Sequence, residues 1–206
     1  NKSIDILPLV AIYGANASGK TNLINAIRFM KDKIINGTNT NELTGVIPYR
    51  LEANNKTNPS KFEIIFKYEG ILYTYGFLMS NDLIHEEWLF GYFSSQESLI
   101  FERITKNDKI VVKTGNRLKK SKFINYIAQG TRPSQLFLTE AYSKNIKVLN
   151  PIIEWFNKCL HIVKPDSVYS ALIPRAYNDQ KFIEFLSDFL SIADTGINNV
   201  KCEKKI

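Results

Sequence analysis

The sequence predicts a mixed α/β fold, because its hydrophobic pattern changes period three times along the chain. A short apolar run at residues 9–13 precedes a helical pattern in which Leu23, Ile27 and Met30 share one face, with Ile24 beside them. From about residue 46 the pattern alternates as in β-strands, and from residue 119 onward it is helical again. Strand, loop and helix, then antiparallel strands, then helices make a mixed α/β chain.

The first part, residues 1–37, is expected to be a strand–loop–helix unit. Residues 9–13 are continuously apolar and end at Gly14, which is typical of a buried strand in a parallel sheet. Gly37 is the expected end of the helix that follows.

The second part, residues 46–115, is expected to be an antiparallel meander. Residues 61–68 alternate between apolar and mostly charged side chains, and Glu69 and Gly70 form a turn into a second, aromatic-rich strand at residues 71–79. Three more strands are expected at residues 84–92, 99–104 and 110–114, the last two joined by residues 106–109.

The third part, residues 116–206, is expected to be helical. Asn150 is expected to cap a helix whose first residue is Pro151. The apolar face of that helix would comprise Ile152, Ile153, Phe156, Cys159 and Leu160. Another helix is expected to begin near Asp179 and to end before Gly196, with Phe182, Leu186 and Phe189 pointing inward.

Composition excludes several classes of protein. Hydrophobic residues make up 44% and charged residues 23% of the chain, as in a soluble globular domain. No apolar run approaches the ~20 residues of a membrane helix, and the N-terminus lacks a signal-peptide stretch. Cys159 and Cys202 have neither disulfide-framework nor metal-ligand spacing. We expect a cytoplasmic protein without a membrane partner and, since no Met begins the chain, part of a longer protein.

Residues 14–21, Gly-Ala-Asn-Ala-Ser-Gly-Lys-Thr, fit G-x-x-x-x-G-K-[ST] at every fixed position. Small residues allow the backbone N–H groups to surround phosphate oxygens, and the start of the following helix adds partial positive charge. Lys20, the one catalytic candidate, would bridge the β- and γ-phosphates of ATP, and the Thr21 hydroxyl would bind Mg²⁺. The expected nucleotide-binding residues are Gly14, Asn16, Ala17, Ser18, Gly19, Lys20, Thr21 and Asn22.

The loop, with Asn at its third position, resembles the ABC class of ATPases, which includes SMC, RecF and OLD-like proteins. The longer run of residues 11–23 is most similar to bacterial AAA-family ATP-binding proteins of abortive-infection type. Residues 47–51, 73–77 and 150–161 support this resemblance. It implies a partial ABC-type P-loop NTPase head that dimerises with ATP, acts in phage defence or DNA transactions, and works with a nuclease or another effector.

Other elements of the ABC pattern are missing from the sequence. No run of four apolar residues is followed by Asp-Glu, and no signature like Leu-Ser-Gly-Gly occurs. Gln135 and Gln129 are candidates for the glutamine that senses the γ-phosphate, although each could be an ordinary surface amide. Because no carboxylate is placed to orient water, we expect weak ATP binding and negligible turnover by these residues alone.

Two other functions were weighed against an ATP-dependent switch. The chain could be a non-catalytic interaction module with a structural nucleotide, whereas a membrane-transporter ATPase is disfavoured because the signature motif is missing.

The formal net charge is +7, and residues 106–122 are rich in lysine. That run could follow a nucleic-acid backbone or could be a solvated edge, and no aromatic residues are interleaved with it. His85 and His161 lie in no metal or triad pattern, and Glu86 and Glu87 are expected on opposite faces of a strand.

Overall fold

The computed structural model describes residues 7–39, 42–48, 58–107, 109–164, 167 and 172–203. The chain divides into two compact units, Asn1–Ile162 and Val163–Ile206. The part predicted to be helical is therefore divided, since its first helices belong to unit 1 and its last two to unit 2. Residues 49–51 of the stretch 47–51, residues 1–6, and Asp108 of the predicted turn lie outside the described residues.

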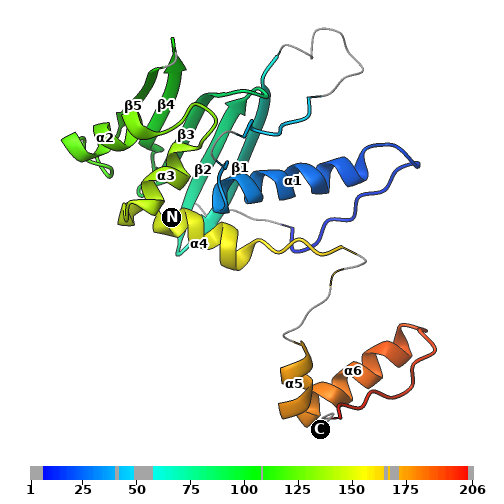
Figure 1. Ribbon diagram of the computed structural model, residues 1–206. Helices are drawn as coiled ribbons and strands as arrows, with labels where there is room; N and C mark the ends of the chain where they lie inside the picture. The colour runs from blue at the N-terminus through cyan, green and yellow to red at the C-terminus, as the bar shows by residue number, and fades with distance from the viewer. Residues whose placement is uncertain are drawn as a thin grey trace. The chain divides into compact units, whose positions relative to one another are not determined.

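Unit 1 contains a five-stranded antiparallel sheet in the order β1-β2-β3-β4-β5, so the predicted meander is confirmed (Figure 1). The strands are β1 (Ser60–Tyr68), β2 (Ile71–Met79), β3 (Ile84–Tyr92), β4 (Ser98–Lys106) and β5 (Lys109–Thr114). Glu69 and Gly70 both have positive φ angles, 49° and 80°, as the tightest hairpin turns require. Lys106 pairs with Lys109 across the last hairpin, as the sequence predicted.

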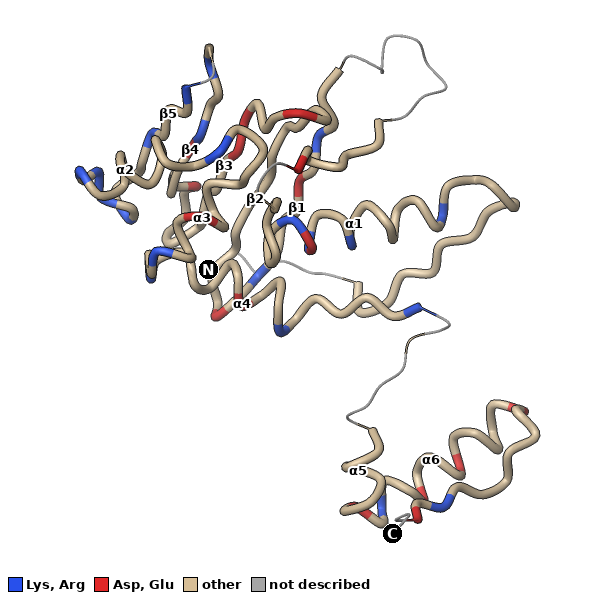
Figure 2. Tube along the Cα trace, viewed as in Figure 1, with Lys and Arg blue, Asp and Glu red and all other residues tan. Residues whose placement is uncertain are grey.

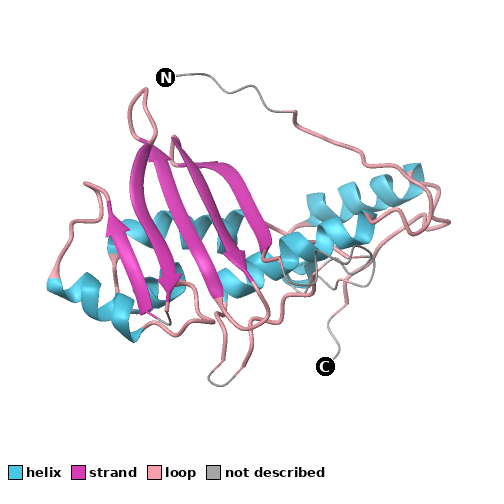
Figure 3. Ribbon diagram, turned by 90° about the horizontal axis from the view of Figure 1, so that it is seen from above, coloured by secondary structure: helices cyan, strands magenta, loops and turns pink. Residues whose placement is uncertain are grey.

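Helices cover one face of this sheet, and the core lies between the two layers (Figure 3). The helices of unit 1 are α1 (Lys20–Ile35), α2 (Lys122–Gly130), α3 (Phe137–Ser143) and α4 (Asn150–Glu154), with a short 3₁₀ turn, η2 (Lys147–Leu149), before α4. Aromatic pairs, with ring centroids 5.0–6.2 Å apart, join this layer to the sheet: Phe29–Phe62, Phe101–Phe137 and Tyr75–Phe156. Burial of these rings therefore holds the helices against the strands.

The strand predicted at residues 9–13 is not formed. These residues adopt no regular structure, and Leu9 and Tyr13 are 82% and 91% exposed. The reason is that a strand requires a neighbour, and the five described strands pair only with one another. The apolar face predicted for α1 is also only half correct, because Leu23 and Ile24 are exposed whereas Met30 and Ile34 are buried. Only the second half of α1 packs in the core.

The helix predicted to start at Pro151 begins one residue earlier. Asn150 has helical backbone angles, and Leu149 occupies the capping position, so the proposed Asn150 cap is wrong. After α4 the chain widens into a π-helical turn, η3 (Trp155–Cys159). A π turn adds a residue per turn and rotates the positions that follow. Ile152 and Phe156 are therefore buried as predicted, while Cys159 is exposed.

Unit 2 contains α5 (Leu172–Asn178) and α6 (Gln180–Ile192). The carboxylate of Asp179 accepts a hydrogen bond from the backbone N–H of Phe182 at 3.1 Å, which fixes the predicted start of α6. Phe182 is buried as predicted, with the Arg175 guanidinium 4.2 Å from its ring centroid, but Phe189 is 56% exposed. Arg175 on α5 contacts Asp179 and Phe182 at the start of α6, whereas Phe185 and Phe189, later in the helix, are exposed. Among the described residues, no helix has the length and apolarity to span a bilayer.

Candidate functional site

The glycine-rich loop at residues 14–19 turns sharply and leads directly into α1. Ala17 and Gly19 have φ angles of +65° and +93°, and the Ser18 N–H donates to the carbonyl of Ala15 at 3.2 Å. A Cβ atom on Gly14 would lie 2.6 Å from the Ser18 hydroxyl oxygen, which is closer than real Cβ contacts allow. Gly19 is therefore required by its backbone conformation, whereas a side chain at position 14 would displace the exposed Ser18 hydroxyl.

The start of α1 presents unpaired backbone donors. Gly19 occupies the capping position, and within the described residues no side chain caps the helix. The first α-helical hydrogen bond runs from the Leu23 N–H to the Gly19 carbonyl, so the N–H groups of residues 20–22 have no partner within the helix. The first turn also has no acidic residue. This end of α1 is therefore suited to an anion.

The Lys20 ammonium lies against the loop. Its Nζ donates to the carbonyl oxygens of Gly14 at 2.6 Å and Ala15 at 2.7 Å, and lies 3.4 Å from the Ser18 hydroxyl. It thus holds the turn together and places a positive charge within the loop that leads into α1. The motif predicted that Lys20 belongs to the loop but not that it contacts the loop's own carbonyl groups.

The remaining predicted site residues flank this arrangement. Asn16, Thr21 and Asn22 are exposed, and the Thr21 hydroxyl has no hydrogen-bond partner among the described residues. No group of three or more His, Cys, Asp or Glu in the described part of the chain could hold a metal ion. A phosphate-loop Mg²⁺ needs fewer protein ligands, because phosphate oxygens and water complete its shell. A nucleotide carrying its own metal would therefore fit the residues present, and Thr21 is the residue that would bind that metal.

The structure places the predicted γ-phosphate sensors away from the loop. The Gln135 amide oxygen accepts a hydrogen bond from the N–H of Thr38 at 2.8 Å, just beyond the C-terminal end of α1. The loop lies at the other end of this 16-residue helix, about 24 Å away. Gln135 is therefore a structural residue at the end of α1, and Gln129 is exposed on α2.

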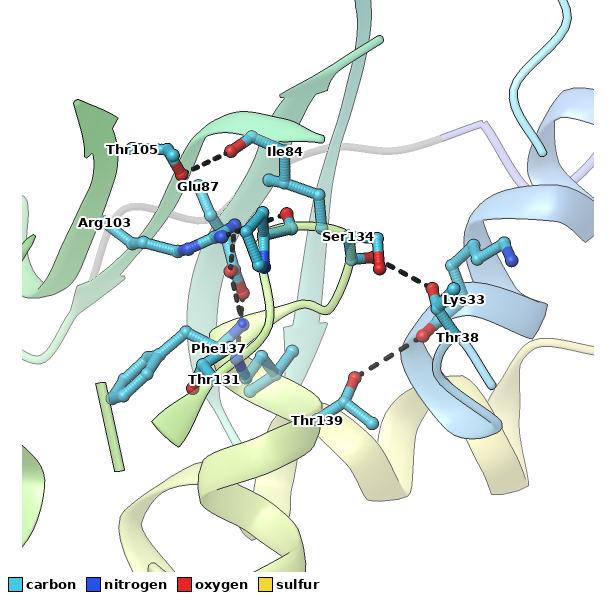
Figure 4. Close-up of polar contacts among 12 residues, drawn as sticks. Lys33, Thr38, Ile84, Glu87, Arg103, Thr105, Thr131, Ser134, Phe137 and Thr139 are labelled. Atoms are coloured by element: carbon cyan, nitrogen blue, oxygen red, sulfur yellow. Dashed lines mark hydrogen bonds and ion pairs between the residues drawn. The ribbon is translucent and has the colours of Figure 1, made fainter. Parts of the chain in front are cut away.

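A second polar centre lies inside the core and was missed by sequence reasoning. The Glu87 carboxylate accepts a hydrogen bond from the N–H of Phe137 at 2.7 Å (Figure 4). It also accepts hydrogen bonds from the N–H of Leu138 and from the Tyr75 hydroxyl, both at 2.9 Å. Arg103 lies 3.9 Å from this carboxylate and donates to the carbonyl of Pro133. Burial raises the pKa of Glu87, and the positive charge of Arg103 and the N–H donors oppose that rise. The residue that could have revealed this buried centre from the sequence is Arg103, a charged side chain at an inward-facing position of β4.

Two histidines and an adjacent pair of glutamates were also singled out in the sequence. Glu86 is exposed and Glu87 buried, so the two carboxylates do lie on opposite faces of β3. The Nε2 atom of His85 lies 3.0 Å from the Ser80 hydroxyl, and that of His161 lies 2.9 Å from the carbonyl of Lys158. Neither histidine joins a metal or catalytic cluster among the described residues.

A phosphate loop that leads into an uncapped helix and holds a lysine ammonium defines a P-loop nucleotide-binding domain. The comparison with protein families agrees. The family described as "AAA domain, putative AbiEii toxin, Type IV TA system" matches residues 9–201, and the chain belongs to this family. It is thus a P-loop ATPase domain of the AAA, abortive-infection type. Searches of curated proteins and of solved structures found no match.

Proposed function

We propose that this chain binds ATP with Mg²⁺ through residues 14–22. The observation that carries the proposal is the contact of the Lys20 ammonium with the loop at residues 14–18, which leads directly into the uncapped start of α1. Lys20 would contact the β- and γ-phosphates, and the N–H groups of Gly19 and the first turn of α1 would hold the remaining phosphate oxygens. Thr21 would bind Mg²⁺, which neutralises phosphate charge, while Asn16 and Asn22 flank the site.

We further propose that ATP binding acts as a switch by joining two copies of the ATPase head. The exposure of the loop supports this, because residues 14–18 lie on the surface and leave space for a second copy beside the phosphates. An ABC-type relationship to SMC and RecF heads would bring the two copies together at their phosphate loops. The family description names a toxin of a type IV toxin–antitoxin system. Beyond it, we propose a role in cytoplasmic phage defence or DNA transactions, with a nuclease or another effector as partner. Lys20 is the one charged side chain of the loop, so slow hydrolysis is expected without a further catalytic carboxylate.

The nucleotide site is tested by thermal unfolding with and without Mg-ATP. A ligand at ~100 times its dissociation constant stabilises a protein by about 2.7 kcal/mol, which raises the midpoint by roughly 5–10 °C for a domain of this size. We expect that shift in the wild type and none in Lys20→Ala. The control is Arg28→Ala, which removes an exposed cation from α1 outside the loop and should keep the shift. Sedimentation of the same samples should show a doubled mass with Mg-ATP only where the shift occurs.

Each outcome has a distinct meaning. A shift that survives Lys20→Ala would place the nucleotide elsewhere and overturn the proposed site. A shift without a change in mass would retain the nucleotide site but contradict the dimerising switch. No shift in any sample would contradict the proposed exchange of nucleotide at this site and favour the alternative, a non-catalytic interaction module.

A further inference from the structure

One stretch of unit 1 carries an excess of positive charge equal to that of the whole chain. Residues 109–139 include seven Lys or Arg and no Asp or Glu, and the formal net charge of the protein is +7. The stretch covers β5, α2 and the loops around them, where lysine and arginine positions gather in Figure 2. Such an excess attracts polyanions, but only the cations without a partner inside the protein are free to bind one.

Three of these seven cations have structural partners. Lys113 forms an ion pair with Glu102 at 3.1 Å, the Arg117 guanidinium lies 4.2 Å from the centroid of the Phe93 ring, and Arg132 donates to the carbonyl of Thr38. By contrast, three lysines at the start of α2 are exposed, and within the described residues none has a carboxylate within 4.0 Å: Lys119, Lys120 and Lys122.

The outer face of α2 adds two exposed aromatic rings to these lysines. The inner face buries Ile124, Ile127 and Ala128. Phe123 and Tyr126 point away from that core and are 52% and 70% exposed. They are three positions apart on the helix, which places their Cβ atoms about 5–6 Å from each other. The sequence interpretation missed them, because the lysine-rich run ends at Lys122 and the aromatic residues follow it.

We propose that this face, the α2 surface (Lys119, Lys120, Lys122, Phe123 and Tyr126), binds single-stranded nucleic acid. The unpaired ammonium groups would contact backbone phosphates, and the two rings would stack on unpaired bases. Lysines alone would suit any polyanion. Exposed rings beside them favour a ligand that offers flat faces together with negative charge, which a duplex or an acidic polypeptide does not. This inference does not depend on ATP binding.

The test is fluorescence anisotropy of the whole chain, without nucleotide, using labelled oligothymidylate and oligouridylate of about 20 nucleotides and a DNA duplex of the same length. Replacing Lys119, Lys120 and Lys122 with Gln should weaken binding of every probe about tenfold or more. It should also reduce the slope of log K against log salt for single strands by about 2, since each phosphate contact contributes about 0.7. The control replaces Lys67, Lys181 and Lys201 with Gln, which removes the same charge from other exposed positions and should change binding little.

The aromatic contribution is tested by the double variant Phe123→Ser and Tyr126→Ser. Losing the stacking contacts should weaken single-strand binding about fivefold or more, and duplex binding should stay unchanged because its bases are not available. Both side chains are exposed, so the variant should keep the wild-type circular dichroism spectrum and unfolding midpoint. The DNA and RNA probes show which single strand is preferred.

Three results would overturn the proposal. One is the absence of saturable binding to either single-stranded probe at about 50 mM salt, where phosphate contacts are strongest. Another is an equal loss of affinity in the control lysine variant, because binding would then follow net charge alone. The third is displacement of the oligonucleotide by poly-glutamate at matched charge, with no effect of the aromatic variant, which would indicate an acidic protein partner.

Discussion

At the scale of single residues, one carboxylate joins three parts of unit 1. Glu87 on β3 accepts hydrogen bonds from the first N–H groups of α3 and from Tyr75 on β2, and pairs with Arg103 on β4. It therefore caps the start of a helix, accepts the hydrogen bond of the buried Tyr75 hydroxyl and supplies the counter-ion of Arg103, whose Nε and Nη1 atoms have no hydrogen-bond partner among the described residues. Removing its charge would leave the buried guanidinium without a counter-ion.

Glu87→Gln tests this role. The neutral amide would offer one acceptor oxygen where two backbone N–H groups now donate, and Arg103 would remain buried without an opposite charge. We expect a loss of about 3–5 kcal/mol in the free energy of unfolding, measured by urea denaturation. The neighbouring Glu86→Gln, on the exposed face of β3, should change it by no more than about 0.5 kcal/mol. Equal effects of the two substitutions would contradict the structural role of Glu87.

The residues that form the phosphate loop could be predicted from the sequence for a local reason. The spacing of the phosphate-loop motif fixes which residues form the turn, so Gly14, Ser18, Gly19 and Lys20 do lie together. The strand period likewise placed Glu86 and Glu87 on opposite faces. The partner of Glu87 could not be predicted, because Arg103 is brought beside it only by the pairing of β3 with β4.

At the scale of elements, the end of α1 is shaped by a glycine and a distant glutamine. Gly37 has a φ angle of +71°, and its N–H donates to the carbonyl of Lys33 as the helix ends. Gln135 packs on Gly37 and accepts a hydrogen bond from the next N–H, that of Thr38. The end of α1 is thus joined to the segment that precedes α3.

Gly37→Ala should destabilise the protein by about 1–2 kcal/mol or more. Alanine disfavours the left-handed conformation by about that amount, and its Cβ would lie 2.6 Å from the Gln135 side-chain nitrogen. Gly130→Ala is the matched control, since it lies at the end of α2 with open space around it and should be neutral or stabilise by up to about 1 kcal/mol. Thermal unfolding of both variants measures the difference. A neutral Gly37→Ala would show that this helix end can relax.

Helices and strands that depend on local interactions could be predicted from the sequence, whereas those that depend on distant partners could not. The five strands were predicted to within two residues, because alternation and turn residues are local signals. The strand at residues 9–13 was wrong, because apolar residues form a strand only beside another strand. The prediction that Cys159 lies on the apolar face of its helix was wrong for a different reason, because the spacing of apolar residues does not reveal a π turn.

At the scale of the whole molecule, the hydrophobic core belongs to unit 1. Every buried residue of the core cluster lies between Met30 and Phe156, whereas the buried Phe182 of unit 2 lies outside the cluster. Both tryptophans of the chain, Trp88 and Trp155, also lie in unit 1. Tryptophan fluorescence therefore reports on the sheet and its helices without a signal from unit 2.

A chain that ends at Ile162 should keep its fold. We expect its urea unfolding, followed by tryptophan fluorescence, to remain cooperative and to match that of the full chain to within about 0.5 kcal/mol. The reference is the full chain under the same conditions. A broad transition, or a loss of several kcal/mol, would show that residues 163–206 contribute to the stability of unit 1.

The π turn of η3 has a practical consequence for spectroscopy. It leaves the Cys159 thiol exposed near the end of unit 1, and the only other thiol, Cys202, is half-buried in unit 2. Each unit therefore carries one native attachment point for a spin label, without an engineered cysteine. Double electron–electron resonance would measure the distance between the two labels, one in each unit. Repeating the measurement with Mg-ATP would show whether nucleotide changes that distance.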